Sequence, residues 1–250
     1  MNIFKKLFGS KPKIEEKKVD QNSKTSFKTT TISKSDLDKL KVGDTISFGE
    51  PDVEKIEYKS IWIKPNENPY NMEIFDCREY ALNMTSTTQN PEIANKFLKL
   101  RESDGKKYIG TFPVNGAKCE VDLSYDTKGK QIPDGIVFKA QKMEEKWDIY
   151  KYANFLFFVR SWTGEMVYFS NYIPTEKGFN VNLVVLDDSK IDQADPFFEF
   201  KVVDFLIHSH ILGYNLPHPI PKNIDRNNSE SILGYSFSMF GNRGQFATYE

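Results

Sequence analysis

The sequence contains few of the residues that build metal centres and covalent scaffolds. Its two cysteines, Cys77 and Cys119, lie far apart without a C-x-x-C spacing, which excludes a cysteine-rich zinc module and a disulfide scaffold. We expect both to be reduced, partly buried thiols. No apolar run approaches the ~20 residues that cross a bilayer. The first residues also lack the apolar core and small-residue cleavage site of a secretory signal, so we expect a cytoplasmic protein.

A strong charge of one sign is also missing from the chain as a whole. The net charge of −1 at pH 7 gives no chain-wide reason to expect nucleic acid or an acidic substrate, and we predict no nucleic-acid partner. Aromatic residues, in contrast, are plentiful. The 20 Phe and 12 Tyr supply large apolar areas, so a chain of 250 residues can bury a substantial core.

The N-terminal part differs in composition from the rest. Residues 10–31 are rich in Lys, Ser and Thr, which predicts a disordered linker. Ahead of the linker, one face of a short helix could touch a membrane surface or dock a partner, although two turns are too short to hold a helix in water. The apolar side chains of that face are Ile3, Phe4, Leu7 and Phe8. We expect a basic tail at 1–32 and a single domain at 33–250, with an alternative sub-boundary near 125–135.

Helix signals occur at two places in the domain. Residues 91–101 follow Asn90 as an N-cap and have Pro91 at the first helical position. Residues 196–212 show an apolar face at helical spacing and stop at a glycine. The stretch 68–84 is ambiguous between helix and strand, and we interpret it as a helix.

Strand signals dominate the centre and the end of the chain. Residues 146–170 predict a three-stranded meander that turns at Ala153-Asn154 and at Thr163-Gly164. Asn115-Gly116 stands between two alternating runs and is the strongest hairpin signal in the chain. The other expected strands lie at 45–48, 53–63, 135–140, 179–186, 231–240 and 245–250. The last two of these are expected to form a closing hairpin.

These elements predict the α+β class. We expect a mainly antiparallel sheet, made of the meander and the hairpins, covered by two or three helices. The helices at 91–101 and 196–212 are expected to cover one face of that sheet.

All three histidines of the chain, His208, His210 and His218, lie within one short segment. On a helix, residues two apart differ by roughly 200° around the axis. His208 and His210 would then point to nearly opposite sides, whereas a strand would place them on one face. No carboxylate stands at the spacing of a facial triad or an H-E-x-x-H arrangement. We therefore predict no metal site and no cofactor.

The stretch R-S-W-T-G-E-M-V-Y is the most distinctive part of the sequence. On an extended strand Arg160 and Trp162 share a face, where the guanidinium could stack on the indole or meet an anion. In the alternative, Arg160 is an edge residue paired with Glu165 or Glu145, and Trp162 belongs to the core. The candidate residues for binding a ligand or a partner are Arg160, Trp162, Glu165, Tyr150 and Tyr168.

The same region carries a resemblance. The segment K-W-D-I-Y-K-Y-A-N-F-L-F-F-V-R-S-W-T-G-E-M-V-Y resembles one in uncharacterised bacterial proteins, where a W-x-[IV]-[FY] strand leads to an R-S-W-T-G turn. The resemblance covers residues 146–168, and it implies no activity. The opening M-N-I-F-K-K-L-F-G is similar to the openings of small bacterial cytosolic proteins, some of them immunity proteins.

Catalytic signatures are missing. The sequence has no G-x-S-x-G, P-loop, dinucleotide or kinase motif, and we predict no catalytic residue. We interpret the glycines around Arg243 as a hairpin turn, and 187–195 as a solvated acidic loop. The first hypothesis is a non-enzymatic bacterial binding protein, of the immunity or accessory type, whose partner is another protein. The alternatives are an enzyme or small-ligand binder that uses Arg160 and Trp162, and a peripheral membrane protein held by residues 1–8.

Overall fold

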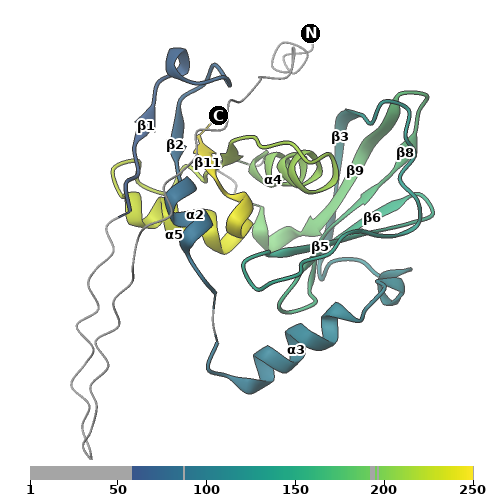
Figure 1. Ribbon diagram of the computed structural model, residues 1–250. Coiled ribbons are helices and arrows are strands. Elements are labelled where there is room, and N and C mark those ends of the chain that lie inside the picture. Colours follow the sequence, from purple (N-terminus) through teal and green to yellow (C-terminus); the bar gives the residue numbers. More distant parts are fainter. Residues whose placement is uncertain (1–57, 87, 192–194, 196, 250) are drawn as a thin grey trace, which may run out of the picture. The chain divides into compact units, whose positions relative to one another are not determined.

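The computed structural model describes residues 58–249 except 87, 192–194 and 196 (Figure 1). By the contacts between its residues, Tyr58–Glu250 forms one compact unit. The expected apolar N-terminal helix, the linker, the domain start at 33 and the strand at 45–48 lie outside the described residues.

Two sheets and the helices packed on them give the chain an α+β fold, as the sequence predicts. The larger sheet has seven antiparallel strands in the order β3-β9-β7-β6-β5-β4, with β8 paired to β9. Its strands are β3 (Gly116–Asp126), β4 (Gly135–Phe138), β5 (Trp147–Tyr152), β6 (Phe155–Arg160), β7 (Met166–Asn171), β8 (Ile173–Pro174) and β9 (Gly178–Asp187).

The smaller sheet has four short strands in the order β1-β2-β11-β10. Its last pair, β10 with β11, is parallel, and the other pairs are antiparallel. Its strands are β1 (Trp62–Ile63), β2 (Ile74–Asp76), β10 (His218–Pro219) and β11 (Phe246–Thr248). The α-helices of the described residues are α2 (Arg78–Asn83), α3 (Pro91–Arg101), α4 (Phe198–Leu206) and α5 (Ser229–Phe240).

The meander and the first long helix confirm the predictions made from local signals. Strands β5, β6 and β7 follow one another in the sheet and turn at the two predicted places. Ala153 has a φ of 50°, which a tight two-residue hairpin requires. Helix α3 has the predicted bounds, and the Asn90 side chain accepts a hydrogen bond of 2.9 Å from the Glu92 amide.

The two faces of the large sheet are covered by different helices. On the first face, which we call the α4 face, helix α4 buries Phe198, Val202, Val203, Phe205 and Leu206 against the strands. On the second face, which we call the α3 face, Arg101 at the end of α3 bonds to Asp148 of β5. Tyr108 packs there on Tyr150, with 5.7 Å between the ring centroids. The prediction that both helices cover one face is therefore wrong (Figure 1).

Alternation along β5 explains why one strand can serve both helices. Trp147 and Ile149 belong to the core cluster of the α4 face, whereas Asp148 and Tyr150 contact α3 and the segment after it. Side chains of a strand point to opposite faces in turn. A strand that is buried along its whole length therefore needs a cover on each side.

The predicted hairpin at Asn115-Gly116 is wrong. Asn115 does have the φ of 50° that suits such a turn, but residues 106–108 form a 3-10 helix and β3 begins at Gly116. The partner of β3 is β9, and the register between them shifts by one residue between Glu120 and Leu123. The Asn-Gly signal therefore identified a turn correctly. The strand that pairs with β3 is distant in sequence, because it is selected by the packing of the inward side chains. The connection at 127–134, near the alternative sub-boundary, joins β3 to β4 of the same sheet.

The closing hairpin is also wrong in its first half, because residues 229–240 form α5. The Asn228 side chain accepts a hydrogen bond of 2.9 Å from the Ser231 amide and caps the helix. The residues that α5 buries recur at helical spacing: Ile232, Leu233, Ser236, Phe237 and Phe240. Gly241–Arg243 form a 3-10 turn, and β11 then pairs with β2 and β10.

Two further segments differ in detail from the predictions. Residues 68–84 contain both β2 and α2 rather than a single helix. The helix expected at 196–212 is α-helical from Phe198 to Leu206 and π-helical over Ile207–Ile211. None of the helices in the described ranges has the length and apolar character needed to span a membrane.

Candidate functional site

Arg160, the first candidate residue, holds the C-terminal end of α5. Its Nη2 donates to the Ser238 carbonyl at 2.7 Å, and its Nη1 donates to the Met239 carbonyl at 3.2 Å. The guanidinium lies over the Trp147 ring, with Cζ 4.8 Å from the centroid. Carbonyls in the last turn of a helix lack partners within the helix and carry partial negative charge. Arg160 therefore joins the sheet to α5.

Trp162 lies in the turn after β6, where it meets a different cation from the predicted one. Lys146 Nζ is 4.8 Å from the centroid of the Trp162 ring, and the indole Nε1 donates to the Met143 carbonyl at 2.8 Å. Trp162 is half-buried, so it is not a core residue. The Arg160 amide donates to the Glu165 carbonyl at 2.8 Å and closes the turn.

The two candidate tyrosines lie on opposite faces of the sheet. Tyr150 is on the α3 face, where its hydroxyl accepts from Lys139 Nζ at 2.6 Å. Tyr168 is on the α4 face, where its hydroxyl donates to the Glu199 carboxylate. Burial raises the pKa of both tyrosines, and the charge of Asp148 or Glu199 adds to that effect. The five candidate residues are therefore not gathered around one site.

The histidines are also separated, each against its own aromatic ring. His208 is half-buried, 3.3 Å from the Asp204 carboxylate, and packs on Tyr125. His210 lies against Phe138, and His218 lies against Phe240 in the core. Burial lowers the pKa of His210 to about 3 and that of His218 to about 4, so both are neutral at pH 7.

A buried ionic cluster on the α3 face was not predicted from the sequence. Arg101 donates to both Asp148 oxygens at 2.8 Å, and Asp148 is 1% exposed. Lys139 Nζ lies 3.4 Å from Asp148 and donates to the Leu100 and Ser103 carbonyls at 2.6 and 2.9 Å. All the groups have partners, so the cluster fixes α3 to the sheet rather than offering a reactive group.

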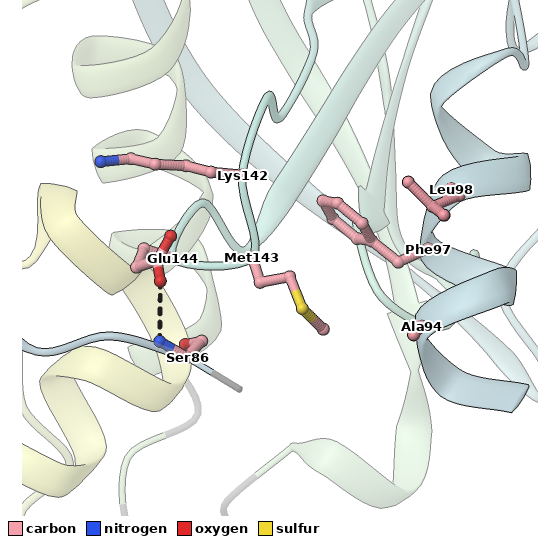
Figure 2. Close-up of a pocket in the computed structure, with 7 residues that line it drawn as sticks. All are labelled: Ser86, Ala94, Phe97, Leu98, Lys142, Met143 and Glu144. Atoms are coloured by element: carbon pink, nitrogen blue, oxygen red, sulfur yellow. Dashed lines mark hydrogen bonds between the residues drawn. The ribbon is translucent and has the colours of Figure 1, made fainter. Parts of the chain in front are cut away.

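An apolar groove lies between α3 and the 140–146 segment. It has a volume of about 370 Å³. Figure 2 shows Phe97 of α3 and Met143 facing each other across it, with Ser86 and Glu144 beyond Met143. The lining residues are Ser86, Ala94, Phe97, Leu98, Lys142, Met143 and Glu144. Glu144 accepts a hydrogen bond of 2.7 Å from the Ser86 amide and holds that segment in place.

Next to the groove, Lys146 is buried without an ion pair to any of the described residues. Its side chain is 7% exposed, and within the described residues no carboxylate forms an ion pair with it. Its Nζ donates to the Met143 carbonyl and lies 2.8 Å from Ser86 Oγ. Burial, and then the charge of Arg160, lower the pKa of Lys146 to about 8.

On the α3 face, the segment that follows Tyr108 leaves large apolar side chains in solvent. Phe112 is 56% exposed, yet its ring touches Phe169, which in turn stacks on Phe155. The ring centroids are 4.9 and 5.0 Å apart. We call the exposed set the loop patch; its members are Ile109, Phe112, Val114 and Phe155.

Sequence reasoning missed both the groove and the loop patch for different reasons. The environment of Lys146 comes from Ser86, Met143, Trp162 and Phe237, which belong to separate segments. No local motif signals such a contact. The loop patch does have a local signal, because Ile109, Phe112 and Val114 stand among turn-forming residues. The sequence prediction assigns this segment to a strand of a hairpin instead.

No family model, curated protein or solved structure matches this chain. The resemblance of 146–168 to uncharacterised bacterial proteins therefore stays a prediction.

Proposed function

We propose that this chain is a binding protein that recognises another protein through the loop patch. The observation that carries the proposal is the continuous row of rings Phe112, Phe169 and Phe155, of which the outer two are open to solvent. Single exposed apolar side chains are normal on a protein surface. A contiguous aromatic group at the surface is typical of a site that a partner covers.

The rim of the patch defines the chemistry of the partner. Lys118 and Glu120 of β3 pair with Val185 and Leu183 of the α3 face, and both charged residues are exposed. They place one charge of each sign beside the apolar centre. Interfaces commonly have an apolar centre and a polar rim. We infer a protein partner that presents an apolar side chain to Phe112, flanked by charges of both signs.

The wider setting that we propose is the bacterial cytoplasm, with a role of the immunity or accessory type. This part of the proposal rests on the composition and on the resemblance of the sequence. Encoding beside a toxin gene would support the immunity type.

The test replaces the exposed ring at the centre of the patch. Full-length wild-type protein and Phe112→Ser are used as baits in extracts of the native host, and captured proteins are quantified by mass spectrometry. A protein that depends on Phe112 is then purified and titrated in a calorimeter. Loss of a central aromatic anchor costs about 2 kcal/mol, so we expect Kd to rise about 30-fold.

The matched control is Phe197→Ser, because Phe197 is 67% exposed and lies outside the patch, just before α4. An unchanged Kd for this control would show that loss of an exposed phenylalanine outside the patch does not weaken partner binding. The proposal fails if the purified partner binds Phe112→Ser as tightly as wild type. It also fails if sedimentation equilibrium shows that the patch is covered by a second copy, with a dimer that Phe112→Ser dissociates.

A further inference from the structure

Lys146 differs from Lys151, a second deeply buried lysine among the described residues. Lys151 is equally exposed, at 7%, but it lies 2.6 Å from the Asp134 carboxylate. The amine of Lys146 has instead the Ser86 hydroxyl, the Met143 carbonyl, and the rings of Trp162 and Phe237 at 4.8 and 4.6 Å. Burial and the charge of Arg160 make this ammonium give up its proton more easily, and the charge of Glu144 offsets only part of that effect. This explains the lowered pKa described above.

Lys146 Nζ donates to Ser86 Oγ at 2.8 Å, and the neutral form of the amine can use the same contact as a base. A neutral Nζ has two N–H bonds and one lone pair. One N–H donates to the Met143 carbonyl at 2.8 Å, and the lone pair can accept the hydroxyl proton of Ser86 over the other 2.8 Å contact. A hydroxyl within hydrogen-bond distance of a base with a pKa near neutrality is the arrangement of an activated nucleophile.

Ser86 also lies where a substrate could reach it. It lines the groove, whose apolar wall is formed by Phe97, Leu98 and Met143 and whose lining also includes Ala94, Lys142 and Glu144. Glu144 holds the Ser86 amide at 2.7 Å, so the position of this residue does not depend on a ligand. The groove therefore places an apolar group near the Ser86 hydroxyl (Figure 2), and Lys146 Nζ lies 2.8 Å from that hydroxyl.

We propose that Ser86 is a nucleophile activated by Lys146, and that it hydrolyses carboxylic esters whose apolar acyl group lies in the groove between α3 and the 140–146 segment. This activity goes beyond partner binding and is carried by different residues. The chemistry is acyl transfer to serine and then to water.

Each step conserves atoms and charge. Ser86 Oγ attacks the ester carbonyl carbon while Lys146 Nζ takes the hydroxyl proton. The bond from the carbonyl carbon to the alcohol oxygen then breaks, and Lys146 returns the proton to the departing alkoxide. A water molecule attacks the acyl-Ser86 ester, and Lys146 accepts its proton. The bond between Oγ and the acyl carbon breaks, Oγ regains the proton, and the carboxylic acid leaves.

The first test is covalent labelling of the full chain with a fluorophosphonate, which reacts with activated serines. We expect a single addition that peptide mass spectrometry places on Ser86, and none on Ser86→Ala. General-base catalysis by a side chain contributes about 100-fold or more, so Lys146→Met should slow labelling by about 100-fold. The buried control Lys151→Met should label like wild type.

A pH profile separates a base from a merely structural lysine. The labelling rate of wild type should rise with pH and level off above about 8, because only the neutral amine accepts the proton. Hydrolysis of p-nitrophenyl butyrate should follow the same profile and disappear in Ser86→Ala.

The proposal is overturned if wild type labels no faster than heat-denatured chain, or if Lys146→Met labels as fast as wild type. If Lys146→Met does not fold, a wild-type profile that is flat through pH 8 overturns it. None of these readouts involves the protein partner, so failure here leaves the binding proposal intact, and failure of partner binding leaves this one intact.

Discussion

The α4 face and the α3 face of the large sheet share every strand but are built with different chemistry. The α4 face is mainly apolar: Phe158 and Ile149 are fully buried in its core cluster. The α3 face combines a buried ionic cluster around Asp148 with rings that are open to solvent at Phe112 and Phe155. The α4 face therefore buries the larger apolar cluster, while the α3 face leaves part of its apolar surface exposed.

The comparison also shows how the two covers are attached. Helix α4 buries five apolar side chains, and the hydroxyls of Tyr168 and Tyr125 also donate to its Glu199 and Asp204 carboxylates. Helix α3 buries only Phe97 and Leu100 and is held in place by the bidentate bond from Arg101 to Asp148. Directional bonds fix the position of a helix that has little apolar surface to bury. The groove beside Phe97 depends on that position.

The largest effect is expected from removing a ring on the α4 face. Phe158→Ala should lower the free energy of unfolding by about 4 kcal/mol, because it deletes a fully buried side chain and leaves a cavity. Urea unfolding followed by circular dichroism measures the change. Phe155→Ala, in the same strand but 40% exposed on the α3 face, should cost less than half as much. Equal losses in both variants would contradict the comparison.

A somewhat smaller effect is expected from breaking the ionic cluster of the α3 face. Arg101→Met should cost about 3 kcal/mol, because Asp148 stays buried after losing its bidentate partner. The side chain of Arg226, which pairs with Glu73 at 2.5 Å, is 47% exposed, so Arg226→Met should cost much less. A loss for Arg101→Met no larger than that of Arg226→Met would show that packing, not the cluster, holds α3.

The smallest effect concerns pH, and it should come from His218 of β10, which packs against Phe205 of α4. The pKa of buried His218 is lowered to about 4, so between pH 6.5 and 4 the unfolded chain binds a proton that the native protein does not. Stability from this residue is therefore present above that window and is lost as the pH falls through it. Between about pH 7 and about pH 5 the loss from His218 should be about 2 kcal/mol.

His218→Phe measures that contribution, because the ring stays among Phe205 and Phe240 but no longer titrates. Urea unfolding of the variant at both pH values should show a pH dependence smaller by about 2 kcal/mol. A variant that loses as much stability on acidification as wild type would show that His218 does not contribute.

Much of the fold could be predicted where neighbours in sequence are also neighbours in space. The meander of β5, β6 and β7 and the caps of α3 depend on contacts within a few residues, and alternation and turn residues were enough to predict them. The partner of β3 and the helical state of 229–240 depend on distant packing. In α5 the spacing of Ile232, Ser236 and Phe240 was present but was interpreted as a strand.

The candidate sites were less predictable than the fold for the same reason. Arg160 and Trp162 stand in a distinctive turn, which makes them candidates, but the Arg160 guanidinium contacts α5, some 80 residues later in the chain. Lys146 carried no motif at all. The lowered pKa of Lys146 comes from its burial, and its contact with the Ser86 hydroxyl comes from the fold. Neither feature can be predicted from the local sequence.

The register shift in β3 has a consequence for the behaviour of the protein at high concentration. β3 is an edge strand of the large sheet and is eleven residues long, and among the described residues no strand pairs with its other edge. A flat edge of that length would add a strand from any neighbouring copy. The extra residue between Glu120 and Leu123 bends the edge, and the exposed charges of Lys118, Glu120 and Asp122 line it. The edge is thereby protected against open-ended aggregation.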